Sequence, residues 1–137
     1  TYLRHHARGY IFSGAVPAGY ANIALAALND LRREPERVQQ IWDNGDYYLA
    51  GLTQLGFDPR TCETPSVPIM TRSNEGTVQF AQLCREKGLL VAPVCFPAVP
   101  MDAPRLRTCV TAGHEQRELD VALNILADAG RQCGVID

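Results

Sequence analysis

The chain has 137 residues with a formal net charge of -2, and 46% of its residues are hydrophobic. This length suffices for one hydrophobic core, so we expect residues 1–137 to form a single domain. The slight acidic excess argues against a nucleic-acid or anionic-membrane partner, because both favour basic surfaces. No apolar run approaches the roughly 20 residues that cross a bilayer, so we also expect no membrane span.

The first half of the chain predicts an extended segment followed by two long helices. Residues 9–12 are aromatic or β-branched apart from Gly9 and are expected as a short strand. Apolar residues then recur at helical spacing from residue 18 to about 33, after Pro17 in the first turn. Pro35 begins a second helix that runs to Gly56. Its expected apolar face comprises Val38, Ile41, Trp42, Leu49, Leu52 and Leu55.

The pair Asn44–Gly45 lies inside that second helix and could instead form a hairpin turn. The helical period continues in register on both sides of the pair, and no alternating strand pattern flanks it. We therefore expect the helix to run through it.

The second half predicts strands at residues 66–71 and 89–94, separated by a helix. Pro68 removes a backbone donor from the first strand, which favours an edge position. Ser73 is expected to cap the helix, which ends at Lys87 before Gly88 and turns Val78, Ala81 and Cys84 inward. A connection with three prolines, residues 95–104, leads to a third strand. A last helix, about residues 115–129, places Leu119, Ala122, Leu123 and Leu126 inward and stops at Gly130.

The third strand, within residues 104–114, carries two arginines on one face. Residues two apart in a strand share a face, so Arg105 and Arg107 lie with Cys109, and Leu106, Thr108 and Val110 lie opposite. One interpretation is that water solvates both arginines on an open sheet face. The other is a carboxylate clamp, because the guanidinium fork matches a carboxylate in two parallel hydrogen bonds.

Together these elements predict an α+β fold, with a small, largely antiparallel sheet and helices packed on one face. The other face of the sheet is expected to remain open. Such a face meets solvent, another domain or a ligand, and the two arginines are expected on it.

The five cysteines are odd in number and form no C-x-x-C pair, which fits neither a disulfide framework nor a zinc site. They are Cys62, Cys84, Cys95, Cys109 and Cys133. We expect reduced, mostly buried thiols, no metal site and a cytoplasmic location. Thr1 is not an initiator residue, which suggests that the chain is a segment of a longer protein.

Five polar residues are candidates for a chemical role beside a structural one. His114 is expected to cap or pack a helix start, and a catalytic base is the alternative. Cys109 could be a nucleophile, although buried thiols are usually inert. Ser13 fits turn chemistry, or a contact to a phosphate oxygen near a helix start. His5 and His6 lack partners at metal-ligand spacing and are expected at the surface.

Six short segments, in order and with compatible spacing, resemble the C-terminal part of the α-oxoamine synthases, a family of acyltransferases that depend on pyridoxal 5'-phosphate (PLP). The segments are RGYIFS at residues 8–13, WDN at 42–44, FPAVP at 96–100, RLR at 105–107, TAGH at 111–114 and GVI at 134–136. The resemblance implies the small domain of the fold-type I PLP enzymes, with residues 1–17 connecting it to a large domain upstream. It also implies a homodimer.

The resemblance further implies a role for two residues. Arg107 would bind the carboxylate of an amino-acid substrate, and Ser13 would contact the PLP phosphate of the neighbouring subunit. The family often has threonine after that serine where this chain has Gly14. The lysine that binds PLP would lie upstream, so this segment would hold no catalytic residue and would be inactive alone.

The implied reaction condenses an amino acid with an acyl thioester, carried by coenzyme A or a carrier protein. Two alternatives remain open at this point. One is a conventional aminotransferase small domain, and the other is a non-catalytic α+β module for ligand binding or dimerisation.

Overall fold

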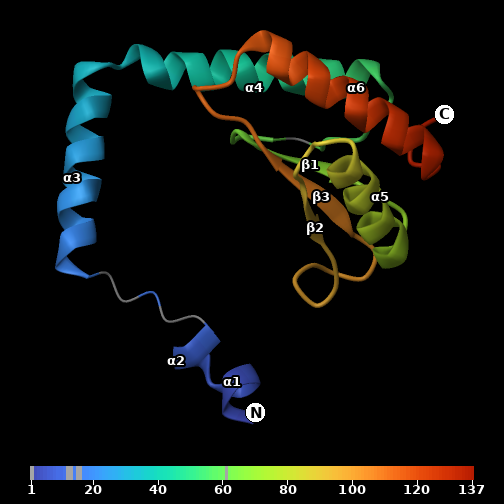
Figure 1. The fold of residues 1–137 in the computed structure, drawn as a ribbon, viewed down its shortest axis with the longest axis horizontal. Coiled ribbons are helices and arrows are strands. Elements are labelled where there is room, and N and C mark those ends of the chain that lie inside the picture. Colours follow the sequence, from blue (N-terminus) through green and yellow to red (C-terminus); the bar gives the residue numbers. More distant parts are fainter. Residues whose placement is uncertain (1, 12–13, 15–16, 61) are drawn as a thin grey trace. The chain divides into compact units, whose positions relative to one another are not determined.

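The structure is a computed structural model that describes residues 2–11, 14, 17–60 and 62–137 (Figure 1). It consists of two compact units, Thr1–Pro35 and Glu36–Asp137. The first unit contains only helices among its described residues. They are α1 (Tyr2–His6), α2 (Arg8–Ile11) and α3 (Ala18–Arg33).

The strand expected at residues 9–12 is wrong for residues 9–11, which lie in the helix α2. Strand propensity reflects packing on a sheet surface, and the described part of this unit offers no partner strand. Phe12 lies outside the described residues. The expected helix from residue 18 to about 33 is confirmed by α3, whose first turn includes a hydrogen bond from the Tyr20 N–H to the Pro17 carbonyl at 2.9 Å.

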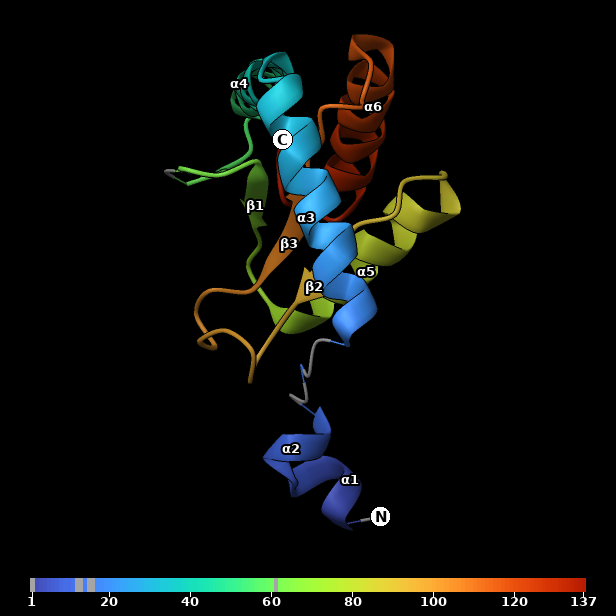
Figure 2. The ribbon, with the colours of Figure 1, turned by 90° about the vertical axis from the view of Figure 1, so that its left-hand side faces the viewer.

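The second unit contains a three-stranded antiparallel sheet in the order β1-β3-β2 (Figure 2). Pro68 lies on the edge strand β1, as expected, so its missing donor removes no bond from the centre of the sheet. The elements of this unit are α4 (Glu36–Gln54), β1 (Ser66–Met70), α5 (Asn74–Glu86), β2 (Ala92–Val94), β3 (Arg105–Cys109) and α6 (Gln116–Gln132).

One hydrophobic core joins the three helices of this unit to one face of the sheet, which confirms the predicted α+β class. In Figure 1, α4 and α6 run side by side above the strands and α5 lies beside them. The stacked rings of Phe57 and Phe80, with centroids 6.1 Å apart, lie within this core. Its fully buried members include Leu52, Ile69, Phe80, Cys84, Leu106, Leu126 and Ala129.

The inward faces of α4 and α5 differ in part from the expected ones. The helix α4 runs through Asn44 and Gly45 as predicted, but its buried positions are Asn44, Gly45, Tyr48 and Leu52. Val38 and Trp42, expected inside, are 44% and 42% exposed. In α5, Ser73 caps the helix as predicted by accepting the Gly76 N–H at 3.0 Å. Val78, expected inside, is 52% exposed, and Phe80 is buried instead. Residues two apart on a helix point in nearly opposite directions, so the two side chains cannot share the inward face.

The last helix was expected to stop at Gly130, and this is wrong because α6 continues to Gln132. Gly130 is buried there, and a Cβ atom at this position would lie 2.7 Å from Cζ of Phe57. The glycine therefore serves close packing of a ring against the helix rather than helix termination. Gly134, with φ +64°, adopts the left-handed conformation after the helix end.

The expectation of mostly buried thiols is confirmed for Cys84 and wrong for Cys109, and the other three cysteines are half-buried. Only Cys84 is buried, Cys109 is exposed, and all five are free. Cys109 is exposed because β3 turns it to the same face as Arg107, away from the core. In the described residues, no helix is both long and apolar enough to cross a membrane.

Candidate functional site

The central strand β3 presents Arg107 on the sheet face opposite the helices. Leu106 and Thr108 are buried toward the helices, and Arg107 between them is exposed. Arg107 pairs with Pro68 on β1 and with Ala92 on β2. Both neighbours are small and carry no charge, so they leave the guanidinium accessible and bind none of its donors.

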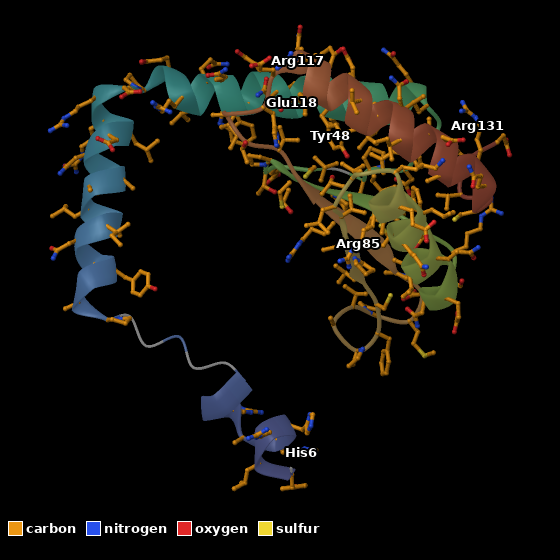
Figure 3. All side chains as sticks on the ribbon, in the orientation of Figure 1. His6, Tyr48, Arg85, Arg117, Glu118 and Arg131 are labelled. Atoms are coloured by element: carbon orange, nitrogen blue, oxygen red, sulfur yellow. The ribbon has the colours of Figure 1, made fainter. Side chains whose placement is uncertain are left out.

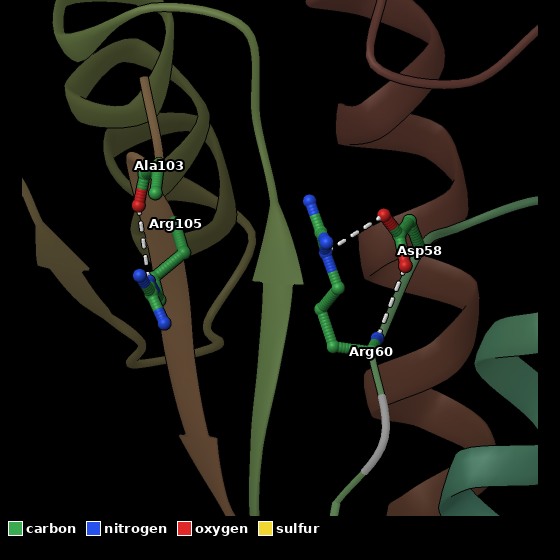
Figure 4. Close-up of polar contacts among 4 residues, drawn as sticks. All are labelled: Asp58, Arg60, Ala103 and Arg105. Carbon is green, nitrogen blue, oxygen red and sulfur yellow. Dashed lines mark hydrogen bonds and ion pairs between the residues drawn. The ribbon is translucent and has the colours of Figure 1, made fainter. Parts of the chain in front are cut away.

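The two arginines of the strand have different environments, and Figure 4 shows that of Arg105. Nε of the half-buried Arg105 donates to the Ala103 carbonyl at 3.0 Å. Arg60 in the same view forms an ion pair with Asp58, in which Nε lies 3.2 Å from Oδ2. Arg107 forms no hydrogen bond or ion pair with any described residue. Its five donors are therefore free to bind an anion.

A pocket of about 640 Å³ opens beside Arg107. The pairing of β2 with β3 begins there, at Ala92, and leaves the following residues of β3 uncovered on that side. Its volume suits a small molecule, and its wall is mostly apolar. Tyr48 extends from α4 toward the sheet and Glu118 comes from the first turn of α6 (Figure 3). The lining comprises Tyr48, Leu89, Leu90, Val91, Ala92, Arg107, Thr108, Cys109, Val110, His114, Glu118, Leu119 and Ala122.

Tyr48 forms a neutral part of the wall. Burial raises the pKa of Tyr48 to about 12, and a hydrogen bond with the Thr108 side chain opposes that rise. The phenol therefore keeps its proton at neutral pH. The Thr108 hydroxyl in turn donates to the Val67 carbonyl at 2.8 Å.

The turn between β3 and α6 is held by a side chain from α4. Nδ2 of Asn44 donates to the carbonyl oxygens of Thr111 at 3.0 Å and His114 at 2.9 Å. Sequence reasoning did not assign Asn44 a role. The signal was available, because a buried amide on the inward face of an amphipathic helix must find hydrogen-bond partners.

His114 closes this turn rather than capping the helix that follows. Its Nδ1 accepts the Thr111 N–H at 3.1 Å, and the N-cap position belongs to Glu115. The Glu115 N–H donates to Oε2 of Glu118 at 2.9 Å, which completes the helix start. The capping interpretation of His114 is thus corrected to a turn contact, while its imidazole also lines the pocket.

The contacts of the other candidate residues that the structure describes support no chemical role for them. Ser13 lies outside the described residues. The Cys109 thiol donates to the Ser66 hydroxyl at 3.6 Å, and no basic side chain among the described residues forms a hydrogen bond with it. The single lysine, Lys87, forms an ion pair with Asp128. His5 and His6 are exposed on α1, and in the described part of the chain no cluster of metal-ligating side chains occurs.

The sequence matches a known protein family and is similar to several curated proteins. The sequence pattern of the family described as aminotransferase class I and II matches residues 1–126. The chain is 37% identical to the 8-amino-7-oxononanoate synthase of Symbiobacterium thermophilum over 134 residues, which cover 98% of this chain and 34% of that protein. It is 32% identical to the enzyme of that name from Bacillus pumilus, with 99% and 35% covered.

Solved structures give the same relationship. The chain superposes on serine palmitoyltransferase from S. paucimobilis with bound PLP-myriocin aldimine at a TM-score of 0.81 and 28% identity, covering 98% of this chain and 34% of that one. The serine palmitoyltransferase of Sphingomonas wittichii gives a TM-score of 0.80 and 25% identity, with the same coverage. The chain therefore spans about a third of the length of the relatives it matches.

Proposed function

Because the chain belongs to the aminotransferase class I and II family and its relatives there are α-oxoamine synthases, we propose that it is the small-domain part of a PLP-dependent acyltransferase. In this proposal residues 1–137 form the C-terminal part of the enzyme, and residues 1–17 connect it to a large domain. The whole protein condenses an amino acid with an acyl thioester, borne by coenzyme A or a carrier protein, to give an α-amino ketone. It works as a homodimer.

The observation that carries the proposal is the unpaired guanidinium of Arg107 beside an apolar pocket. An arginine on the central strand of a sheet is held firmly by the backbone, and the planar fork binds a carboxylate with two parallel hydrogen bonds. Arg107 therefore binds the carboxylate of the amino-acid substrate. Arg105, whose Nε is engaged by the Ala103 carbonyl, supports the strand instead.

The residues at the open face are compatible with a PLP-bound amino acid. The described side chains there offer a free cation for a carboxylate and place no competing carboxylate against Arg107. When bound, PLP serves as the electron sink for the carbanion that forms on the amino acid. Arg107 would hold the substrate carboxylate and so orient the amino acid. Ser13, outside the described residues, is proposed to contact the cofactor phosphate.

Two other functions share some of these features. A conventional aminotransferase would have the same fold and the same use for Arg107, but both curated relatives above are synthases by name. A non-catalytic module for ligand binding or dimerisation would share the fold and the exposed Arg107 but would release no thiol. Release of a free thiol from an acyl thioester, measured with a panel of amino acids, separates the acyltransferase from both.

The test of Arg107 uses the complete protein with PLP. Replacement of Arg107 by alanine removes two charge-assisted hydrogen bonds, so we expect the KM for the amino acid to rise roughly 10- to 100-fold. The cofactor absorbance should remain in place. Arg105→Ala is the matched control on the same strand and should leave that KM within about threefold. An unchanged KM in Arg107→Ala would rule out the carboxylate clamp.

A further inference from the structure

The turn between β3 and α6 fixes which nitrogen of His114 carries the hydrogen. Nδ1 accepts the Thr111 N–H, so the neutral imidazole bears its hydrogen on Nε2. The Asn44 amide holds both ends of the same turn through the Thr111 and His114 carbonyls. The ring is therefore fixed in position and in tautomer by contacts that leave Nε2 unused.

The polar groups of the Arg107 pocket are satisfied with two exceptions. Thr108 donates to the Val67 carbonyl, Tyr48 bonds to Thr108, and Glu118 accepts the Glu115 N–H. The thiol of Cys109 donates to Ser66. In the part of the chain that the structure describes, the guanidinium of Arg107 and the Nε2–H of His114 are the two side-chain donors of this pocket without a partner.

We propose that His114 is a second substrate-binding residue, whose Nε2–H donates to an oxygen atom of the carboxylate-bearing substrate held by Arg107. This inference rests on the proposed function, because it takes the ligand of Arg107 to be the amino-acid substrate. The rest of the lining is largely apolar and offers few other partners to a polar group of the substrate. Asn44 acts on the substrate only through His114 and is a positioning residue.

Two conservative substitutions separate the pocket contact from the turn contact. In His114→Asn, the side-chain Oδ1 can replace Nδ1 as acceptor of the Thr111 N–H, but no donor reaches the Nε2 position. In His114→Gln, the longer amide can place its Nε2 where the imidazole Nε2 lies, but the acceptor of the Thr111 N–H is lost. The first variant removes the substrate contact, and the second weakens the turn.

The experiment measures amino-acid KM, kcat and thermal unfolding for both variants in the complete protein with PLP. We expect His114→Asn to raise the KM about three- to tenfold at unchanged melting temperature. His114→Gln should keep the KM within about twofold while its melting temperature falls. A wild-type KM in His114→Asn, or a raised KM that occurs only together with lower stability in His114→Gln, would overturn the proposal.

Arg107→Ala, measured in parallel, separates this inference from the function on which it rests. A raised KM in Arg107→Ala with an unchanged KM in His114→Asn means that the clamp is present and His114 is structural only. An unchanged KM in both variants means that the amino acid does not bind at this pocket, which removes both proposals.

Discussion

Nδ2 of Asn44 lies 2.9 Å from the carbonyl oxygen of His114, 70 residues further along the chain. This hydrogen bond ties the middle of α4 to the turn that enters α6. The same nitrogen also binds the Thr111 carbonyl. One amide thus binds two backbone acceptors of a tight turn, and the Thr111 carbonyl also accepts the His114 N–H at 3.3 Å.

Replacement of Asn44 by leucine should destabilise the protein by about 1–3 kcal/mol, because the His114 carbonyl loses the Asn44 donor in a partly buried site and the Thr111 carbonyl keeps only the His114 N–H. Urea unfolding measures the loss. Gln39→Ala is the control on the same helix, since its exposed bond to Asp43 should contribute less than about 0.5 kcal/mol. Equal unfolding midpoints for Asn44→Leu and wild type would show that the two hydrogen bonds of Asn44 do not contribute to stability.

Replacement of Gly130 by alanine should cost about 1–3 kcal/mol through overpacking. The added Cβ would lie 2.7 Å from Cζ and 2.9 Å from Cε1 of Phe57, and that ring stacks on Phe80 in the core. Gly45→Ala is the matched control, because a Cβ there meets nothing within 4 Å in the helix α4. The control should be neutral or gain up to about 1 kcal/mol. Thermal unfolding of the two variants decides the matter, and equal stability would contradict the packing argument.

The thiols should differ in their reaction with iodoacetamide. Burial raises the pKa of Cys84 to about 11, so at pH 8 almost none of its thiolate is present, and the side chain is also inaccessible. Cys109 is exposed and should be modified first. Peptide mapping by mass spectrometry after brief labelling measures the order. Cys109→Ser should remove the fast site, whereas modification of Cys84 before unfolding would argue against its burial.

The parts of the fold that the sequence predicted are those determined by local periodicity. The alternation in β3 placed Arg107 and Cys109 on one face correctly, and the helical period carried α4 correctly through Asn44–Gly45. Pro68 correctly indicated an edge strand, since its missing donor excludes a central one. Each of these depends on backbone geometry that a few neighbouring residues decide.

Contacts between distant segments could not be read in this way. Gly130 was predicted as a helix stop because glycine often ends helices. Its packing against Phe57 joins residues far apart in sequence and leaves no local pattern. Residues 9–11 looked like a strand because propensity alone does not say whether a partner strand exists. The position of His114 in the pocket lining depends on its bond to Thr111 and on where β2 begins, at Ala92. Neither feature leaves a pattern in the sequence.

The central position of β3 has a consequence for local opening of the protein. Its amides are bonded on both sides, to β1 and to β2, whereas each outer strand has one unpaired edge among the strands of this sheet. Hydrogen exchange in such a sheet is fastest at the edges and slowest in the middle strand. Arg107 is therefore carried by the segment that opens last, and fraying of β2 could widen the pocket without moving the guanidinium's own backbone.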